Sequence, residues 1–209
     1  MYTKVFLRLE PLGLELAAQA VRSAGHEVRL IDLQVQALRD RERSLREWRP
    51  DVVAFSCNYL ANIPEIVDLA RLAKQWCPAC FVCIGGHSAS FTAKALLEHG
   101  AGAIDCVLKG EGEAALPALL EAVAGDRAAL TMVPGAVSAK GEGPPPKFVA
   151  SLDDIRPARD LVQRRRSYFL GVLDPCASVE FSRGCPWDCT FAAPGPSMAG
   201  ATGCTARNG

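Results

Sequence analysis

Short apolar runs alternate with longer amphipathic stretches between residues 11 and 124. Four of the runs predict strands, at residues 27–33, 51–57, 81–84 and 104–109, and each ends in polar residues or glycines. The stretches before, between and after them repeat apolar residues at helical spacing, at residues 11–24, 34–48, 64–76, 90–98 and 113–123. Strands that alternate with helices form a parallel sheet, so the pattern predicts an α/β fold with a doubly wound parallel sheet.

The third run ends at two glycines, in the order Phe-Val-Cys-Ile-Gly-Gly-His-Ser over residues 81–88. Glycine has no Cβ, so the backbone can bend sharply there and a ligand can approach it closely. In an open parallel sheet the binding crevice lies outside the carboxyl ends of the strands. We therefore expect the functional site at the edge of the sheet where this run ends.

The two ends of the chain differ from this pattern. Residues 1–9 could hold a first strand around Phe6, but Glu10 and Pro11 follow with almost no loop. From residue 129 the chain predicts a small hairpin and a Pro-rich linker, and residues 179–181 resemble a new strand. We divide the chain into residues 1–128, residues 129–178, residues 179–191 and a tail of residues 192–209.

Composition narrows the function classes. The 23 basic and 23 acidic residues cancel, which argues against non-specific nucleic-acid binding, and the charged stretch 39–49 is expected to form a solvated helix face. No apolar run reaches the ~18 residues needed to span a bilayer, and no secretion signal is visible. The nine cysteines are not spaced as a disulfide framework, so a cytoplasmic location is expected.

The most specific run is Ser-Arg-Gly-Cys-Pro-Trp-Asp-Cys-Thr-Phe over residues 182–191. It resembles the opening strand and cluster loop of radical S-adenosylmethionine enzymes, whose signature is Cys-x3-Cys-x2-Cys. The resemblance implies thiolate ligands for a [4Fe-4S] cluster that in turn chelates S-adenosylmethionine. Cys185 and Cys189 match the first two ligands, but Ala192 stands at the third position. Thiolates hold such clusters, and two of them are not expected to retain one stably. This chain is therefore expected to bind neither the cluster nor S-adenosylmethionine.

The tail after Phe191 consists mostly of Ala, Gly, Pro, Ser and Thr, a composition that cannot bury a core. A catalytic barrel of repeated strand–helix units needs on the order of 200 residues, far more than follow Val179. We interpret the chain as truncated or frameshifted after about residue 191, with an unstructured tail and no catalytic activity of its own.

Four short motifs occur in the order found in cobalamin-binding domains that precede radical-enzyme barrels: Pro-Leu-Gly-Leu at 11–14, Ala-Gly-His-Glu-Val at 24–28, Gly-Gly-His-Ser at 85–88 and Gly-Glu-Gly-Glu at 110–113. Over residues 1–191 the chain is most similar to the hopanoid C-3 methylase family. The resemblance implies a flavodoxin-like fold that binds the corrin ring across the carboxyl ends of the strands. That family has a strand before Pro-Leu-Gly-Leu, whereas residues 1–9 look more like the loop after it, so the central strand is expected to be missing.

The resemblance also implies the cofactor-binding residues. The pocket would be lined after one strand by Ser56, Cys57, Asn58, Tyr59 and Leu60. The nucleotide tail would pass Gly85, Gly86, His87 and Ser88, and the far side would be closed by Gly110, Glu111 and Gly112. Glu111 would accept hydrogen bonds from corrin amides or the ribose. Older cobalamin-binding domains ligate cobalt through the histidine of the motif Asp-x-His-x-x-Gly. This motif is absent here, so no histidine is expected to ligate cobalt.

The sequence thus predicts the cobalamin-binding domain of a radical S-adenosylmethionine methylase, whose intact relative methylates a hopanoid lipid. A different cobalamin-dependent radical enzyme, or a flavodoxin-like domain without a cofactor, stays open. Residues 110–115 match a dinucleotide fingerprint in form, but two glutamates there would repel a pyrophosphate. A phosphoacceptor domain would need an aspartate near residue 56. A zinc site at Cys77, Cys80 and Cys83 would lack a fourth ligand.

Overall fold

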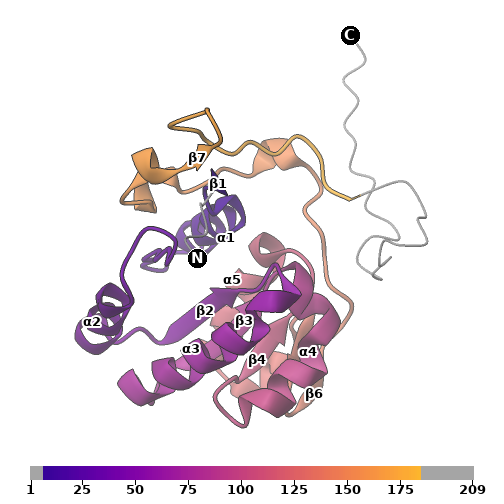
Figure 1. Ribbon diagram of the computed structural model, residues 1–209. Coiled ribbons are helices and arrows are strands. Elements are labelled where there is room, and N and C mark those ends of the chain that lie inside the picture. The colour runs from indigo at the N-terminus through magenta and orange to yellow at the C-terminus, as the bar shows by residue number, and fades with distance from the viewer. Residues whose placement is uncertain (1–6, 185–209) are drawn as a thin grey trace.

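The computed structural model describes residues 7–184. Its central sheet has the order β2-β3-β4-β5-β6. The strands β2 (Val52–Ser56), β3 (Phe81–Gly85) and β4 (Cys106–Leu108) pair in parallel, and the hairpin of β5 (Ala136–Ser138) and β6 (Gly141–Glu142) continues the sheet antiparallel beyond β4 (Figure 1). The predicted α/β fold is confirmed. The antiparallel attachment of the hairpin was not predicted.

Helices cover both faces of this sheet. The helices α3 (Ile63–Trp76) and α4 (His87–Gly100) bury Ile66, Ala70 and Leu96 against Val82 and Ile84 of β3. The helix α5 (Gly112–Ala124) packs on the opposite face, where alternate residues of β3 point. The helix α1 (Leu12–Ser23) lies against α5, and α2 (Leu38–Trp48) lies beside α3. Short 3₁₀ turns complete the chain at Leu60–Asn62, Arg127–Met132, Leu152–Asp154, Arg159–Leu161 and Arg165–Ser167.

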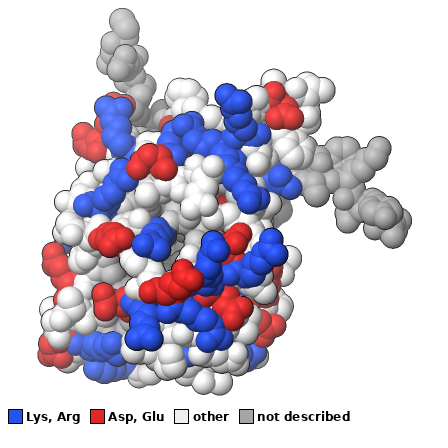
Figure 2. All heavy atoms as spheres, turned by 90° about the vertical axis from the view of Figure 1, so that its left-hand side faces the viewer, with Lys and Arg blue, Asp and Glu red and all other residues white. Residues whose placement is uncertain are grey.

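The charged helix α2 departs from the expectation of a fully solvated face. Arg41 is buried, and its guanidinium lies 4.9 Å from the ring centroid of Trp76 in α3. A guanidinium stacks well on an aromatic face, and its aliphatic stem can lie on apolar surface. Figure 2 shows basic and acidic side chains interleaved over the face that carries α2, as the balanced charge predicts.

The predicted strand at residues 27–33 does not form. This segment runs between α1 and α2, but no backbone hydrogen bond joins residues 27–31 to any other residue between 7 and 184. The strand β1 (Leu7–Arg8) pairs antiparallel with β7 (Phe169–Leu170), outside the central sheet. Within the described chain, no strand therefore fills the space between residues 27–33 and the edge of β2. A strand needs a hydrogen-bonding partner, and this segment has none there.

The predicted strand at residues 179–181 is also absent. Val179 and Phe181 are 65% and 87% exposed, and this stretch has no strand partner within residues 7–184. Its β-forming side chains favour an extended backbone, but side-chain preference alone does not supply the hydrogen-bonding partner that a strand needs.

No helix in the described part of the chain is long and apolar enough to cross a bilayer.

The segment after residue 150 lies across α1, on the side away from the sheet (Figure 1). It is held by buried polar contacts: the hydroxyl of Tyr168 donates to Asp32 at 2.8 Å, and the guanidinium of Arg159 donates to the carboxylate of Glu10. The backbone N–H of Ser178 also donates to Glu10 at 3.0 Å. Burial would raise the pKa of Glu10, but these two donors hold it below its ordinary value.

Glu15 is buried next to this pair and lacks a compensating donor. It is fully inaccessible to solvent, and neither carboxylate oxygen has a hydrogen-bond partner among the described residues. Burial raises the pKa of Glu15 from 4.5 to about 7, and the negative charge of Glu10 adds to the effect. The folded chain therefore binds a proton here, between about pH 4.5 and 7, that the unfolded chain releases.

This difference predicts that the free energy of unfolding falls as the pH rises from about 4.5 to 7, and then levels off, because the folded state holds more protons in that window. Glu15→Gln should remove the decrease and stabilise the chain above pH 7 by on the order of 2 kcal/mol. Urea denaturation between pH 5 and 8 measures both effects.

Glu98→Gln, the same replacement at an exposed position on α4, is the matched control and should leave the profile unchanged. A Glu15→Gln profile that still falls between pH 5 and 7 would show that Glu15 is not the responsible group.

Candidate functional site

The loops after β2, β3 and β4 meet at the carboxyl edge of the sheet, at one end of a cavity of about 860 Å³. The cavity also extends along β2 to Trp48 and Asp51 at its amino end. Parallel pairing places these three strand ends side by side, so residues far apart in sequence share one site. The end of β2 and the loop after it contribute Ser56 and Asn58. The end of β3 and the turn into α4 contribute Gly85, Gly86 and His87. The loop after β4 contributes Gly110, Glu111 and Gly112.

Gly86 is the residue on which the contact between the first two loops depends. Its φ of 101° lies in the region that favours glycine, and a Cβ there would come within 2.8 Å of the Asn58 Oδ1 and the Cys57 carbonyl oxygen. The close approach allows the His87 N–H to donate to Asn58 Oδ1 at 3.2 Å, and the Ser88 hydroxyl to the Asn58 carbonyl at 3.0 Å. A larger residue at position 86 would separate these loops.

Four residues expected at the site lie outside the cavity wall. Cys57 is buried in the core, where burial raises the pKa of its thiol. Ser88 is also buried, and its hydroxyl is engaged by Asn58. Tyr59 and Leu60 follow the wall residues directly in sequence and are 68% and 62% exposed. They present apolar surface to solvent one and two residues beyond Asn58.

The histidines and cysteines form no metal site in residues 7–184, where no group of three or more potential ligands comes together. His87 is exposed and packs edge-to-face on Phe91, with ring centroids 5.0 Å apart. His26 lies in the wall of the cavity just after α1. Burial raises the pKa of Cys80 to about 11 and that of Cys83 further, which disfavours the thiolates that zinc would need.

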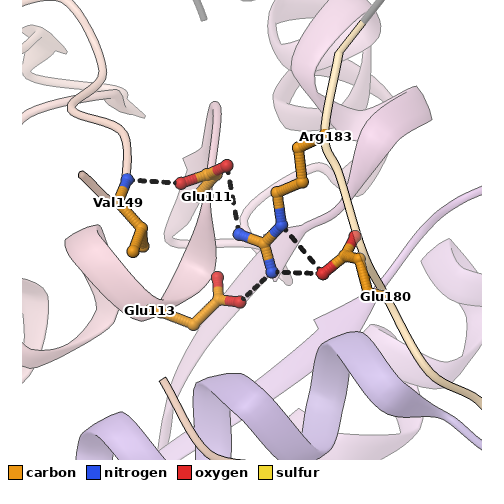
Figure 3. A network of polar contacts seen from close by, with 5 residues as sticks. All are labelled: Glu111, Glu113, Val149, Glu180 and Arg183. Atoms are coloured by element: carbon orange, nitrogen blue, oxygen red, sulfur yellow. Dashed lines mark hydrogen bonds and ion pairs between the residues drawn. The ribbon is translucent and has the colours of Figure 1, made fainter. Parts of the chain in front are cut away.

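Arg183 fastens the end of the described chain to the mouth of the cavity (Figure 3). Its guanidinium lies 3.0 Å from a carboxylate oxygen of Glu111, 2.7 Å from Glu113 and 2.8 Å from Glu180. Burial alone would lower the pKa of Arg183, but the three carboxylates together raise it. The guanidinium also offsets two carboxylates that would otherwise repel each other at the start of α5.

Both carboxylate oxygens of Glu111 are engaged by protein groups, because the Val149 N–H donates to the second oxygen at 2.6 Å (Figure 3). The sequence did not indicate this role of Arg183; the one available signal was its place directly before Gly184 and Cys185. Ser182, Arg183 and Gly184 line the cavity. Cys185, Cys189 and Ala192 lie outside the described residues.

Comparison with known proteins identifies the fold and its family. Residues 1–120 match the family model described as the B12 binding domain. The chain is 65% identical over 191 residues to the hopanoid C-3 methylase of Methylococcus capsulatus, and 30% identical over 189 residues to the uncharacterized methyltransferase PH0819 of Pyrococcus horikoshii. These alignments cover 91% and 87% of this chain, but 37% and 40% of the relatives. The chain thus spans about two-fifths of their length.

A solved structure shares the fold. It is the cobalamin-dependent S-adenosylmethionine radical enzyme OxsB, with aqua-cobalamin and S-adenosylmethionine bound. The two structures superpose with a TM-score of 0.68 over 89% of this chain and 26% of OxsB, at 21% sequence identity. At this identity the likeness supports the α/β fold assignment.

The Arg183 cluster predicts that Arg183→Met will release residues 180–184 from the cavity mouth. Three charge-assisted contacts are lost together, each of a kind worth about 1.5–3 kcal/mol, so local opening should rise about tenfold or more. Limited digestion with a glutamate-specific protease, followed by mass spectrometry, measures cleavage after Glu180, which should accelerate accordingly.

Arg156→Met is the matched control, because Arg156 is exposed on the same segment. In this variant, cleavage after Glu180 should be as fast as in the parent chain. Equal rates for Arg183→Met and the parent would mean that the cluster does not hold the segment.

Proposed function

The chain belongs to the family of B12-binding domains, and from this membership we propose that the glycine-lined cavity at the carboxyl edge of the sheet is its cobalamin site. The observation that carries the proposal is the convergence of three strand ends on one cavity, with Gly85, Gly86 and Gly110 in its wall. Binding clefts of this size, about 300–1,000 Å³, are typical for small molecules and cofactors.

The residues present fit a bulky ligand. A Cβ built on Gly85 meets no atom closer than the Leu108 carbonyl oxygen, at 3.8 Å, so the space next to this backbone is open. Ser56 and Asn58 offer polar side chains to amide groups of a ligand, since both line the cavity. Tyr59 and Leu60 would cover the apolar face of a ring lying outside the strand ends.

Glu111 takes a different role in this proposal from the one its motif suggests. Because Arg183 and Val149 occupy its two oxygens, we assign it to holding the cavity mouth together, not to binding corrin amides. His87 would line the pocket as a polar group. It is exposed at the mouth, and its ring packs on Phe91.

When bound, cobalamin supplies a cobalt-bound methyl group for transfer. The protein would hold the ring outside the strand ends, and Arg183 would hold residues 182–184 at the mouth of the cavity. The 65% identity to a hopanoid C-3 methylase supports hopanoid methylation by a radical S-adenosylmethionine mechanism as the reaction of longer relatives. Another cobalamin-dependent radical methyltransferase is the alternative within the same class.

For this chain itself we propose cobalamin binding without catalysis, since Ala192 stands at the third cluster-ligand position. Cys185 and Cys189 would be remnants of the iron–sulfur site. The six cysteines between residues 7 and 184 are free thiols, which supports a reducing, cytoplasmic location.

The proposal predicts near-stoichiometric retention of cobalt when the purified chain is mixed with hydroxocobalamin and gel-filtered. Gly85→Leu should weaken binding by about tenfold or more, because the side chain would occupy the open space beside the backbone while clashing with no protein atom at its Cβ. Cobalt in the protein peak and a spectral titration measure the loss.

Ala95→Leu adds the same side chain to an exposed position of α4 outside the cavity, and should bind cobalamin as the parent does. Full binding by a folded Gly85→Leu variant would place the cofactor elsewhere. A folded parent chain that retains no cobalt would favour a flavodoxin-like domain without a cofactor.

A further inference from the structure

The connection between α3 and β3 brings two cysteines into one tight turn. Cys77 caps the C-terminal end of α3, where its N–H donates to the Ala73 carbonyl at 2.8 Å, and Cys80 directly precedes β3. The Cys80 N–H donates to the Cys77 carbonyl at 3.1 Å, which closes a four-residue β-turn with Pro78 at its second position. We call residues 77–80 the cysteine turn.

The geometry of this turn suits a disulfide. The first and fourth Cα atoms of a β-turn lie less than about 7 Å apart, and disulfides join residues whose Cα atoms are about 4.4–6.8 Å apart. The side chains of Cys77 and Cys80 are buried in the same hydrophobic cluster, whereas Pro78 and Ala79 between them are exposed. Both thiols therefore lie on the inner side of the turn, as a bond between them requires.

The backbone on the β3 side of the turn is already fixed. The ammonium group of Lys74 donates to the Cys80 carbonyl at 2.6 Å and to the carboxylate of Asp105 at 2.6 Å. The Phe81 N–H donates to the Asp51 carbonyl at 2.7 Å. Closing a ring across the turn therefore needs no movement of β3, and the sheet stays intact.

The environment of the thiols favours the disulfide over the dithiol. Burial raises the pKa of the Cys80 thiol to about 11, and the neighbouring thiol of Cys77 adds to the effect. The turn also follows the C-terminal end of α3, where the helix dipole disfavours negative charge. Dithiols that are kept reduced at equilibrium owe this to a stabilised thiolate, and the cysteine turn offers none.

The turn lies near the protein surface and outside the cofactor cavity. Cys77 is 7% exposed and Cys80 is 1% exposed, so a small reagent reaches the Cys77 sulfur first. Only the exposed residues Pro78 and Ala79 have to move to admit it. Neither cysteine is among the residues that line the cavity, so chemistry at the turn does not depend on cobalamin.

From these observations we propose that Cys77 and Cys80 form a reversible dithiol–disulfide site, which is oxidised by low-molecular-weight disulfides such as oxidised glutathione. The Cys77 thiolate attacks the glutathione disulfide, forms a mixed disulfide and releases one glutathione thiolate. The Cys80 thiolate then attacks the Cys77 sulfur, closes the intrachain disulfide and releases the second glutathione. Two electrons and two protons pass from the two cysteines to oxidised glutathione, which becomes two thiols.

The test uses the full chain, equilibrated without oxygen in mixtures of reduced and oxidised glutathione, then quenched with acid, unfolded and treated with N-ethylmaleimide. The tryptic peptide of residues 75–94 carries Cys77, Cys80 and Cys83. In the reduced chain this peptide should take up one maleimide at each cysteine. In the oxidised chain it should lack two hydrogen atoms and take up maleimide at Cys83 alone, as mass spectrometry measures.

Dilution of the glutathione identifies the reaction. An intrachain disulfide releases two glutathione thiols, so its ratio to the dithiol follows the concentration of oxidised glutathione divided by the square of the reduced. Tenfold dilution of both forms together should raise this ratio about tenfold. A mixed disulfide releases one thiol, so its ratio to the free thiol should not change.

Two variants, each checked for folding by circular dichroism, serve as controls. Cys80→Ala removes the resolving thiol, so Cys77 should reach only the mixed disulfide and lose the response to dilution. Cys83→Ala is the matched replacement at the neighbouring buried cysteine, and should leave both the closure and the tenfold response unchanged.

The proposal is overturned if the folded chain keeps both thiols at every glutathione ratio, or if Cys77 or Cys80 pairs with Cys83 instead. A second sample, refolded from urea in the same mixtures, gives glutathione free access to both sulfurs. An open turn in that sample would show that the geometry does not permit the bond. Closure there but not in the folded chain would show that the folded protein does not react, which also overturns the proposal.

Discussion

The parallel ladder that joins β2, β3 and β4 is the constraint on which the rest of the structure depends. It aligns three strand ends at one edge, and so places Asn58, Gly86 and Gly110 around a single cavity although they are far apart in sequence. The same ladder uses only one edge of β2. The other edge of β2 has no strand partner among residues 7–184, and Val52, Ala54 and Ser56 line the cavity there.

Buried charged groups fix the position of the last thirty residues of the described chain, 155–184. Glu10 binds the linker through Arg159 and Ser178, and Glu111 and Glu113 bind its far end through Arg183. Buried ion pairs contribute little net stability when their desolvation is counted, but breaking one partner is costly. Their effect here is to define where residues 155–184 lie. Residues 182–184, which precede Cys185, are thereby held at the mouth of the cavity.

Much of the fold followed from local pattern. Pro64 in the first turn of α3, and Gly25 with φ of 92° after α1, behave as their residue types predict. The Gly-Gly turn after β3 was also expected, because only glycine tolerates the close approach found at Gly86. The predicted strands at residues 27–33 and 179–181 were wrong. Their composition suits a strand, but each lacks a partner in the described chain.

The sequence by itself thus determined the helices, the three parallel strands and the glycines that leave space at their ends, because these follow from periodicity and backbone preference within a few residues. Only the tertiary structure decided which strand edges are paired, that Cys57 and Ser88 are buried, and that Glu111 is bound by Arg183 and Val149. Those outcomes depend on contacts between residues about 20 to 70 positions apart, as in the pairs Cys83–Cys106 and Glu113–Arg183, and no local pattern encodes such partners.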